Sequence, residues 1–268
     1  MEGQSSHQLA ETLNRLASGG GLIEPLPGDI QRLSIPAGPG GCPQGVYRLA
    51  QLDDTRNLQR YDFNWQPPCT LTLRVRVSAP DLPGTWGFGL WNDPFTASLG
   101  LGGGARSLPA LPNAAWFFHA SLANALSLRD DLPANGFLAA VFSSRNPSPF
   151  LYPAALLAAP LLTWRLTARW LRRTARRWVQ EDSTLLSHDP TVWHDYRLDW
   201  RLGEVSFLVD GQPVAEMPLT PRGRLGLVIW IDNQYAAFKP DGTLKYGVQE
   251  NPTSAWLEIA DLQLYSGR

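Results

Sequence analysis

Apolar and polar positions alternate along residues 193–232, and a period of two residues is typical of half-buried β-strands. Tyr196 and Trp200 lie on the apolar face of the first run, and a second run over 205–209 ends at an Asp-Gly turn. A third run, 225–231, is apolar on both faces, which indicates a strand inside a sandwich. The stretch therefore predicts consecutive antiparallel strands of a two-sheet structure.

The same alternation predicts strands on both sides of this stretch. The clearest are 70–78 and 255–265, and a shorter run at 116–120 consists largely of aromatic residues. Earlier in the chain, Gly87 and Gly89 alternate with bulky residues. Glycines on one face of a strand allow another group to approach the backbone closely. Either a second layer of the protein or a ligand is expected at that face.

Two segments depart from the β pattern. Leu9 and Leu13 stand at helical spacing, which predicts an N-terminal helical arm over residues 1–18. The alternation stops again over 147–187, which predicts a helical insertion. Residues 19–268, including this insertion, show no internal repeat and are expected to form a single domain.

Within the insertion, a basic amphipathic helix is predicted over 161–179. The charge-free run before it, 150–164, is shorter than the roughly 20 residues that span a bilayer and contains two prolines. The helix is expected to lie on a membrane surface, unless its apolar face packs on the sandwich or across a dimer interface. The residues expected to make the contact are Leu161, Trp164, Leu171 and Trp178 on the apolar side and Arg165, Arg169, Arg172, Arg173 and Arg176 on the cationic side.

Composition narrows the classes of function. The formal net charge of -1 lacks the basic surplus of a nucleic-acid-binding protein. The N-terminus is polar where a secretory signal needs a basic start and an apolar core, so a cytoplasmic protein, at most peripheral to a membrane, is expected. Two cysteines, Cys42 and Cys69, make no disulfide framework, although a single bridge stays open. The 11 tryptophans indicate a large aromatic core or an aromatic-lined cleft.

The last third of the chain carries four motifs in a defined order. WHDYRLDW is followed by VSFLVDGQPV, by the apolar strand of PRGRLGLVIWID, and by the final strand WLEIADLQLY. This order resembles the concanavalin A-like lectin/glucanase superfamily and, within it, the family 16 glycoside hydrolases. The resemblance implies an all-β fold, a two-sheet antiparallel jelly-roll sandwich, with a sugar-binding cleft along its concave face.

The chain departs from that family at the catalytic strand. The family's chemistry, as the resemblance implies, uses Glu, Asp and Glu at alternating positions, which places a nucleophile and an acid/base on one face. The corresponding strand here is AAWFFHAS, which has no carboxylate. Asp130 and Asp131 are adjacent and would point to opposite faces of a strand. A protein that does not hydrolyse β-glucans is therefore predicted.

Two functions from different classes remain open. The first is a non-hydrolytic jelly-roll protein that binds or transforms an apolar or aromatic small molecule in an aromatic-lined cleft. The alternative is a carbohydrate-active protein, either a degenerate glycosidase or a lectin, in which the same rings stack on sugars. An apolar cleft would favour the first, and several convergent polar side chains would favour the second. The candidate ligand-binding residues are Trp86, Phe88, Trp116, Phe118 and Trp230.

The sequence offers weaker candidates for catalytic residues than for ligand-binding residues, and none for binding a metal or cofactor. If the cleft is catalytic, the best acid/base pair is His119 with Asp93 or Asp232, because these residues lie next to the aromatic strands. The four histidines show no metal-ligand spacing, so no metal is expected. The glycine-rich run 100–104 is not followed by the Lys-Ser/Thr of a phosphate-binding loop, and no cofactor is predicted.

Overall fold

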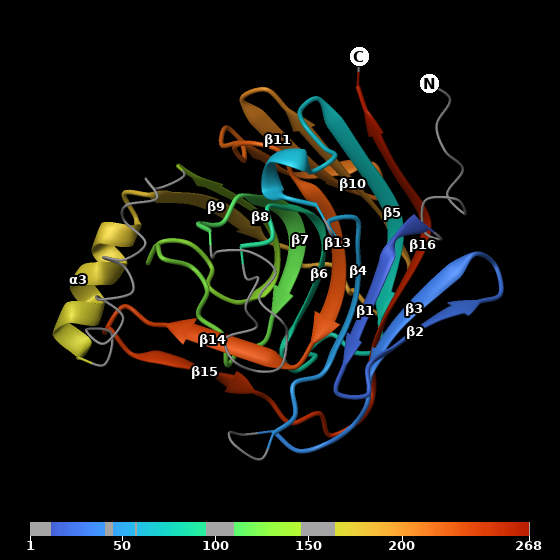
Figure 1. The fold of residues 1–268 in the computed structure, drawn as a ribbon, viewed down its shortest axis with the longest axis horizontal. Helices are drawn as coiled ribbons and strands as arrows, with labels where there is room; N and C mark the ends of the chain where they lie inside the picture. The colour runs from blue at the N-terminus through green and yellow to red at the C-terminus, as the bar shows by residue number, and fades with distance from the viewer. Residues whose placement is uncertain (1–11, 41–44, 57, 95–109, 146–163, 268) are drawn as a thin grey trace.

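Two seven-stranded antiparallel sheets lie face to face in the computed structural model (Figure 1). The structure describes residues 12–40, 45–56, 58–94, 110–145 and 164–267. Sheet A has the order β1 (Asn14–Ser18), β4 (Leu49–Asp53), β13 (Gly226–Asp232), β6 (Thr85–Trp91), β7 (Ala114–Ala120), β8 (Gly136–Ser144) and β9 (Val179–Leu185). Sheet B has the order β12 (Gln212–Met217), β11 (Glu204–Val209), β10 (His194–Arg201), β5 (Cys69–Val77), β16 (Ala255–Ser266), β3 (Ile30–Ile35) and β2 (Leu22–Leu26).

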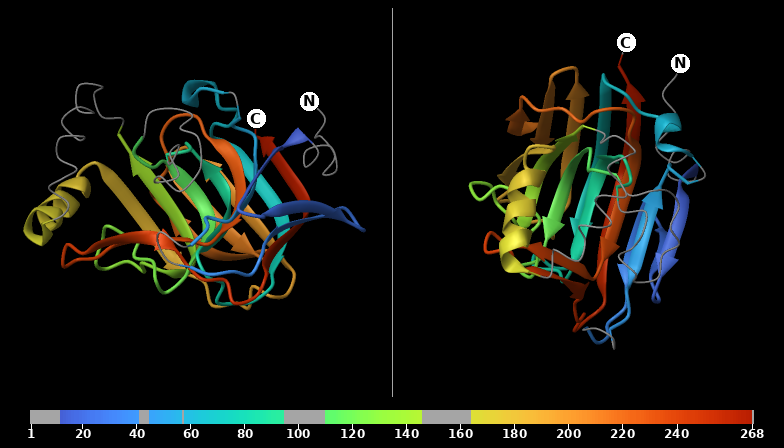
Figure 2. Two further views of the ribbon diagram at one scale, coloured as in Figure 1. Left: turned by 60° about the horizontal axis from the view of Figure 1, so that its bottom comes forward. Right: turned by 60° about the vertical axis from the view of Figure 1, so that its left-hand side comes forward.

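Three smaller elements flank the sheets. A hairpin is formed by β14 (Gln234–Phe238) and β15 (Leu244–Val248), and a 3-10 turn spans Arg60–Asp62. Helix α3 (Arg165–Ala175) lies at the β9 edge of sheet A, close to the hairpin (Figure 2). No helix in the described ranges is both long and apolar enough to span a membrane.

The core lies between the two sheets, where the alternating residues of both meet. In β5 every second residue is buried, as the sequence predicts for a strand with one face on the core. Aromatic rings join the sheets at the centre: Phe88 and Phe117 of sheet A each lie 5.0 Å, centroid to centroid, from Tyr196 of sheet B at T-shaped angles. Removing these apolar groups from water is the main force that holds the sandwich together.

The predicted fold class is confirmed, and the 193–232 stretch forms antiparallel strands joined by turns and one loop. The stretch contains one more strand than predicted, because β12 follows β11 in sheet B. The last strand, β13, then crosses to the middle of sheet A, between β4 and β6. All of its residues are buried, which explains why its sequence is apolar on both faces.

Two predicted helical segments are partly strands. Asn14–Ser18, assigned from the sequence to the helical arm, is β1 and pairs along its whole length with β4. Leu13 and Leu16 are three residues apart, so an extended chain places them on opposite sides, one in the core and one on the outer face of sheet A. Val179–Leu185, assigned to the helical insertion, is β9 and pairs with β8. Residues 1–11 lie outside the described residues.

Candidate functional site

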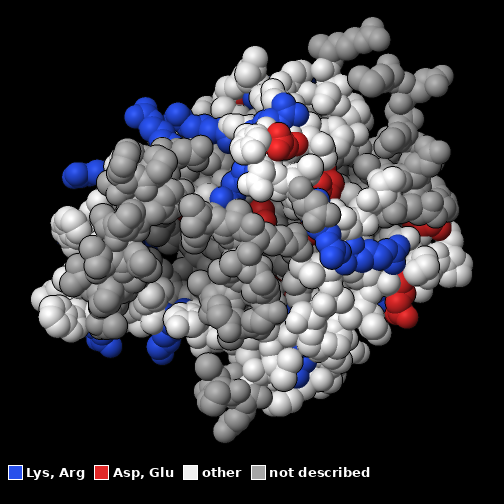
Figure 3. Space-filling view, in the orientation of Figure 1, with Lys and Arg blue, Asp and Glu red and all other residues white. Residues whose placement is uncertain are grey.

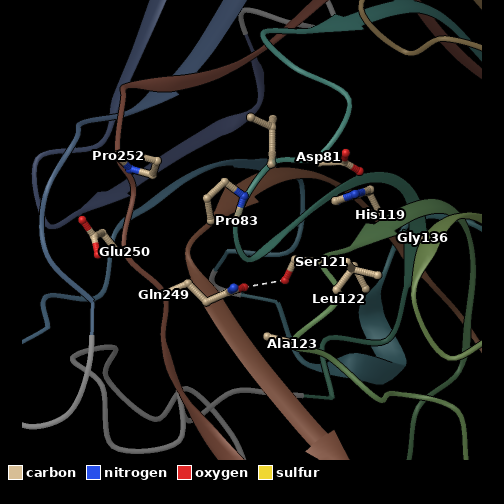
Figure 4. A pocket seen from close by; sticks show the side chains of 12 residues that line it. Asp81, Pro83, His119, Ser121, Leu122, Ala123, Gly136, Gln249, Glu250 and Pro252 are labelled. Atoms are coloured by element: carbon tan, nitrogen blue, oxygen red, sulfur yellow. Dashed lines mark hydrogen bonds between the residues drawn. The ribbon is translucent and has the colours of Figure 1, made fainter.

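A hollow of about 600 Å³ opens at one end of the sandwich, where the loops between strands meet (Figure 4). We call it the end hollow. Its described lining is Asp81, Leu82, Pro83, His119, Ala120, Ser121, Leu122, Ala123, Gly136, Gln249, Glu250 and Pro252. These residues come from the loop between β5 and β6, the end of β7 with its following loop, the start of β8, and the loop between β15 and β16.

A hydrogen-bond network holds these loops together. The Gln249 side-chain oxygen accepts bonds from the Gly84 N–H, at 2.7 Å, and from the Ser121 hydroxyl. The Asn124 amide donates to the Gly84 carbonyl at 3.2 Å and to the Ser121 hydroxyl at 3.0 Å. Gly84 has a φ of +80°, and a side chain there would meet the Asp232 carbonyl oxygen at 2.1 Å. Only glycine fits this position. The hydrogen bonds of Gln249, Ser121, Asn124 and Gly84 link three loops into one rim.

His119 forms one wall of the end hollow. Its side chain is 3% exposed and stacks on Trp86, with ring centroids 5.4 Å apart and planes 12° apart. Burial lowers the pKa of His119 to about 4, although the nearby Asp81 charge acts in the opposite direction. The imidazole is therefore neutral at neutral pH, and its Nδ1 has no hydrogen-bond partner among the described residues. This nitrogen is itself buried, so a hydrogen bond between the imidazole and a molecule in the hollow would have to use Nε2.

The remaining polar groups line different sides of the same space. Asp81 lies beside His119, whereas Glu250 lies across the hollow from them, and the hydrogen-bonded Gln249 and Ser121 lie between these sides (Figure 4). No lysine or arginine is among the described lining residues. The apolar part of the lining consists of Leu82, Pro83, Ala120, Leu122, Ala123 and Pro252. The lining thus combines carboxylate, amide, hydroxyl and imidazole groups with apolar surface.

A second feature is an aromatic cluster on the outer face of sheet A, the face turned away from sheet B. We call it the aromatic face and define it by Trp91, Trp116, Phe118, Phe142 and Trp230. The Trp116 ring centroid lies 5.4 Å from both Phe118 and Trp230, and the Trp91 and Trp230 planes are 8° apart. Within the described structure, the indole N–H groups of Trp91 and Trp116 are buried without a hydrogen-bond acceptor.

Gly87 and Gly89 explain how these rings fit on the sheet. A side chain at Gly87 would approach the Trp230 ring to 2.7 Å, and one at Gly89 would approach the Trp116 Cβ to 2.5 Å. The group that approaches Gly87 is therefore the indole ring of Trp230 on β13, whereas Gly89 is approached by the backbone and Cβ of Trp116 on β7.

The predicted ligand-binding residues divide between the two faces of sheet A. Trp116, Phe118 and Trp230 meet on the aromatic face. Trp86 and Phe88 point the other way, into the core between the sheets. Successive residues of β6 alternate in direction, so its aromatic residues at even positions cannot share a face with its glycines.

The three candidate acid/base residues do not meet. His119 pairs in register with Trp86 near one end of β6, whereas Asp93 follows the opposite end of that strand. Asp232 lies on the outer face of sheet A, and its carboxylate accepts bonds from Thr85 N, at 3.2 Å, and Thr85 Oγ1, at 2.9 Å. Because His119 and Asp232 lie on opposite faces of the sheet, neither aspartate can act with His119.

Sequence reasoning missed most of the end hollow. Asp81, Ser121, Gln249 and Glu250 lie in loops, where hydrophobic periodicity carries no signal. In the described residues, no group of three or more His, Cys, Asp or Glu is arranged to hold a metal ion. Cys69 is buried with a free thiol, and burial raises its pKa to about 12. Cys42 lies outside the described residues.

Comparisons with known proteins bear on the fold. No protein-family model and no curated protein match the chain. A legume lectin-like domain from Entamoeba histolytica is 9% identical, with a TM-score of 0.50, over 100% of this chain and 95% of that one. The carbohydrate recognition domain of Emp46p, in a metal-free form, is 12% identical, with a TM-score of 0.49, over 100% and 94%. A pseudo β-1,3-glucanase of Mycobacterium tuberculosis is 11% identical, with a TM-score of 0.46, over 90% and 76%.

The likeness to the lectin-like domain establishes the architecture. This chain has the concanavalin A-like jelly-roll fold that lectins and glucanases share. Strand β7, which lies between β6 and β8 in sheet A, reads AAWFFHA and has no carboxylate, so the catalytic motif of the family 16 hydrolases is missing from it.

Proposed function

We propose that this protein binds carbohydrate in the end hollow without hydrolysing it. The observation that carries the proposal is that Asp81, His119, Ser121, Gln249 and Glu250 all line one concave space. A sugar presents several hydroxyl groups at fixed angles, and each can donate to a carboxylate or exchange a bond with an amide or a neutral imidazole. Sites of this kind combine a few placed polar groups with apolar walls.

The charge and the apolar walls of the end hollow support a sugar over other small ligands. The two carboxylates, Asp81 and Glu250, with no basic residue among the described lining, disfavour an anionic ligand. The C–H face of a pyranose ring can pack on the exposed side chain of Leu122 and on Pro83 and Pro252. A purely apolar ligand would leave the polar groups without partners, which costs about 1–3 kcal/mol for each buried group.

The apolar or aromatic ligand predicted from the sequence would instead occupy the aromatic face. Trp116 and Trp230 are only 6% and 8% exposed, and they pack chiefly on each other and on their neighbours. Their interlocked rings favour a structural second core over a binding surface. This hypothesis therefore has less support than carbohydrate binding.

Replacing Asp81 with asparagine is expected to weaken glycan binding roughly 10-fold or more, because a hydrogen bond to a charged group contributes about 1.5–3 kcal/mol. A glycan microarray identifies the sugar, and isothermal titration calorimetry then compares wild type, Asp81→Asn and Glu216→Gln. Glu216 is exposed on β12 and serves as the charge-matched control, with unchanged affinity expected. Equal affinity for the Asp81 variant and the wild type, or loss of affinity only in Trp116→Ala, would place the sugar elsewhere.

Incubation with laminarin or lichenan is expected to release no reducing sugar. Retaining glycosidases need two carboxyl groups about 5–5.5 Å apart, and inverting enzymes need them about 6.5–9.5 Å apart. Asp81 and Glu250 come from different loops on opposite sides of the end hollow, with Pro83 between them (Figure 4). Steady release of reducing ends, abolished by replacing a single Asp or Glu, would contradict the non-hydrolytic part of the proposal.

A further inference from the structure

Helix α3 is fastened to the domain by only one of its sides. Arg172 is buried and donates to the Phe238 carbonyl at 3.0 Å, to the Ser127 carbonyl at 3.0 Å and to the Asp130 carboxylate at 2.7 Å. Arg176 makes a second ion pair with Asp130 at 2.5 Å. These two arginines, predicted from the sequence to face a membrane, therefore hold the helix in place.

The hairpin below the helix fixes its first turn. Gly242, in the turn between β14 and β15, lies so close that a side chain there would meet the Arg165 carbonyl oxygen at 2.2 Å and the Arg169 Cγ at 2.8 Å. Ala168, which has the smallest side chain on this side of the helix, is completely buried. Close approach on this side fixes which residues of the helix point outward.

The outward side of α3 is both cationic and apolar. Arg165, Arg169, Arg173 and Arg177 are exposed, and residues 164–178 contain no Asp or Glu. Between these arginines, large apolar side chains are also exposed: Trp164 by 69%, Leu166 by 78% and Trp170 by 63%, with Trp178 by 41%. Figure 3 shows individual Lys and Arg side chains at the left of the molecule, the side on which Figure 1 places α3.

The actual outward set differs from the set that the sequence predicts. The helical wheel places Leu171 on the contact side, but the structure leaves it half-buried, and Leu166 and Trp170 take the outermost positions. Leu161 lies outside the described residues. The wheel alone could not show which side of the helix the domain covers.

We propose that the outward side of α3 is a docking surface for an anionic lipid membrane. Transfer of exposed tryptophan and leucine side chains into an apolar environment is favourable, and the acyl chains below a lipid headgroup layer supply one. Arginine side chains can extend from the same helix face to the phosphate and carboxylate groups of the headgroups. A nucleic acid would pair with the arginines but would leave Leu166 in water. The combination of charge and apolar exposure therefore selects a lipid surface.

The contact is superficial, and it is independent of sugar binding. The helix has 11 residues, about 16 Å at 1.5 Å per residue, and it lies along the surface of the domain. Its residues do not line the end hollow. Loss of membrane binding and loss of glycan binding should thus be separable by substitution.

Vesicle flotation with the full chain tests the proposal. The protein is expected to float with vesicles of phosphatidylcholine mixed with phosphatidylserine, to stay unbound with phosphatidylcholine alone, and to dissociate as salt is raised. Arg169→Gln/Arg173→Gln should lower partitioning roughly 30-fold, since it removes two surface cations. Leu166→Ser/Trp170→Ser should lower it by a similar or larger factor. Soluble phosphoserine is added as a competitor. Release of the protein from the vesicles would indicate recognition of the headgroup alone, whereas unchanged flotation would indicate binding to the lipid surface.

The matched control removes two exposed arginines far from the helix in sequence. Arg56→Gln/Arg201→Gln changes the net charge by the same amount, and partitioning should stay within about twofold of wild type. The α3 variants should unfold at the wild-type temperature, because the replaced side chains are exposed and glutamine keeps the Cγ by which Arg169 lies against Gly242. The proposal fails if wild type does not float with phosphatidylserine vesicles, or if the α3 and control variants lose binding equally.

Discussion

Replacing both Arg32 and Arg76 with alanine is expected to lower the free energy of unfolding by about 3 kcal/mol, because it leaves a buried carboxylate without a cation. Glu258 on β16 is 0% exposed, and its two oxygens accept bonds from Arg32 Nε at 2.8 Å and Arg76 Nε at 2.7 Å. The three residues are in register across β3, β16 and β5. Removing one partner of a buried pair typically costs about 3–5 kcal/mol, and the one-third exposure of both arginines argues for the lower end.

Urea unfolding at neutral pH measures this loss, and two further variants isolate its cause. Adding Glu258→Met to the double variant should recover most of the stability, because an apolar side chain replaces the unpaired charge. Arg32→Lys/Arg76→Lys keeps both charges and should cost less than the alanine pair, although it weakens the stacking of both guanidinium groups on Trp256, at 5.0 and 5.6 Å. A double alanine variant within about 1 kcal/mol of wild type would show that water solvates Glu258 adequately.

Replacing Asp232 with asparagine is expected to make the protein progressively more stable than wild type as pH rises from about 4 to about 7. Burial raises the folded-state pKa of Asp232 to about 7, whereas the unfolded chain has a value near 3.9. A carboxyl group with a raised pKa stabilises the fold fully below the unfolded value, and this contribution is lost as pH rises through the folded value. The difference of about three units corresponds to about 4 kcal/mol.

Asparagine can keep the hydrogen bonds of Asp232. The Asp232 Oδ1 accepts from Thr85 N, Thr85 Oγ1 and Gln234 N, and the amide oxygen of asparagine is an acceptor that can take the same position. The Asp232 carboxylate also bonds to the Tyr47 hydroxyl, with which an asparagine side chain can exchange a hydrogen bond. The variant therefore removes the ionisation with little change in the network around it.

The pH effect should be read from the difference between variant and wild type, because other groups titrate in the same range. His119 acts in the opposite direction: burial lowers its pKa to about 4, so its contribution is present above about 6.5 and is lost as pH falls. Urea midpoints at several pH values between 4 and 8 give the difference curve. Glu216→Gln controls for the loss of one negative charge. A flat difference curve would show that Asp232 ionises normally in the folded protein.

Hydrophobic periodicity was sufficient to predict the β-sandwich and several of its strands. In β5, β10 and β11 the alternation of apolar and polar residues predicts which residues face the core, because each strand is buried on one side. It also identified Gly87 and Gly89 as points of close approach. It failed for β1 and β9, edge strands whose short sequences also suit a helix and whose strand conformation depends on pairing with β4 and β8.

The chain's local pattern thus determined the class of fold, the missing catalytic carboxylates and the existence of a basic amphipathic helix, because each is encoded within a single segment. The tertiary structure decided which surfaces these segments present. Asp81, His119 and Gln249 come together only when two distant loops meet the end of β7. Arg172 and Arg173 are neighbours of identical chemistry, yet Asp130 and two backbone carbonyls make the first a structural anchor and leave the second in solvent. Contacts between residues that are distant in the sequence decide which of these side chains is buried, and the spacing of residues along the chain does not predict those contacts.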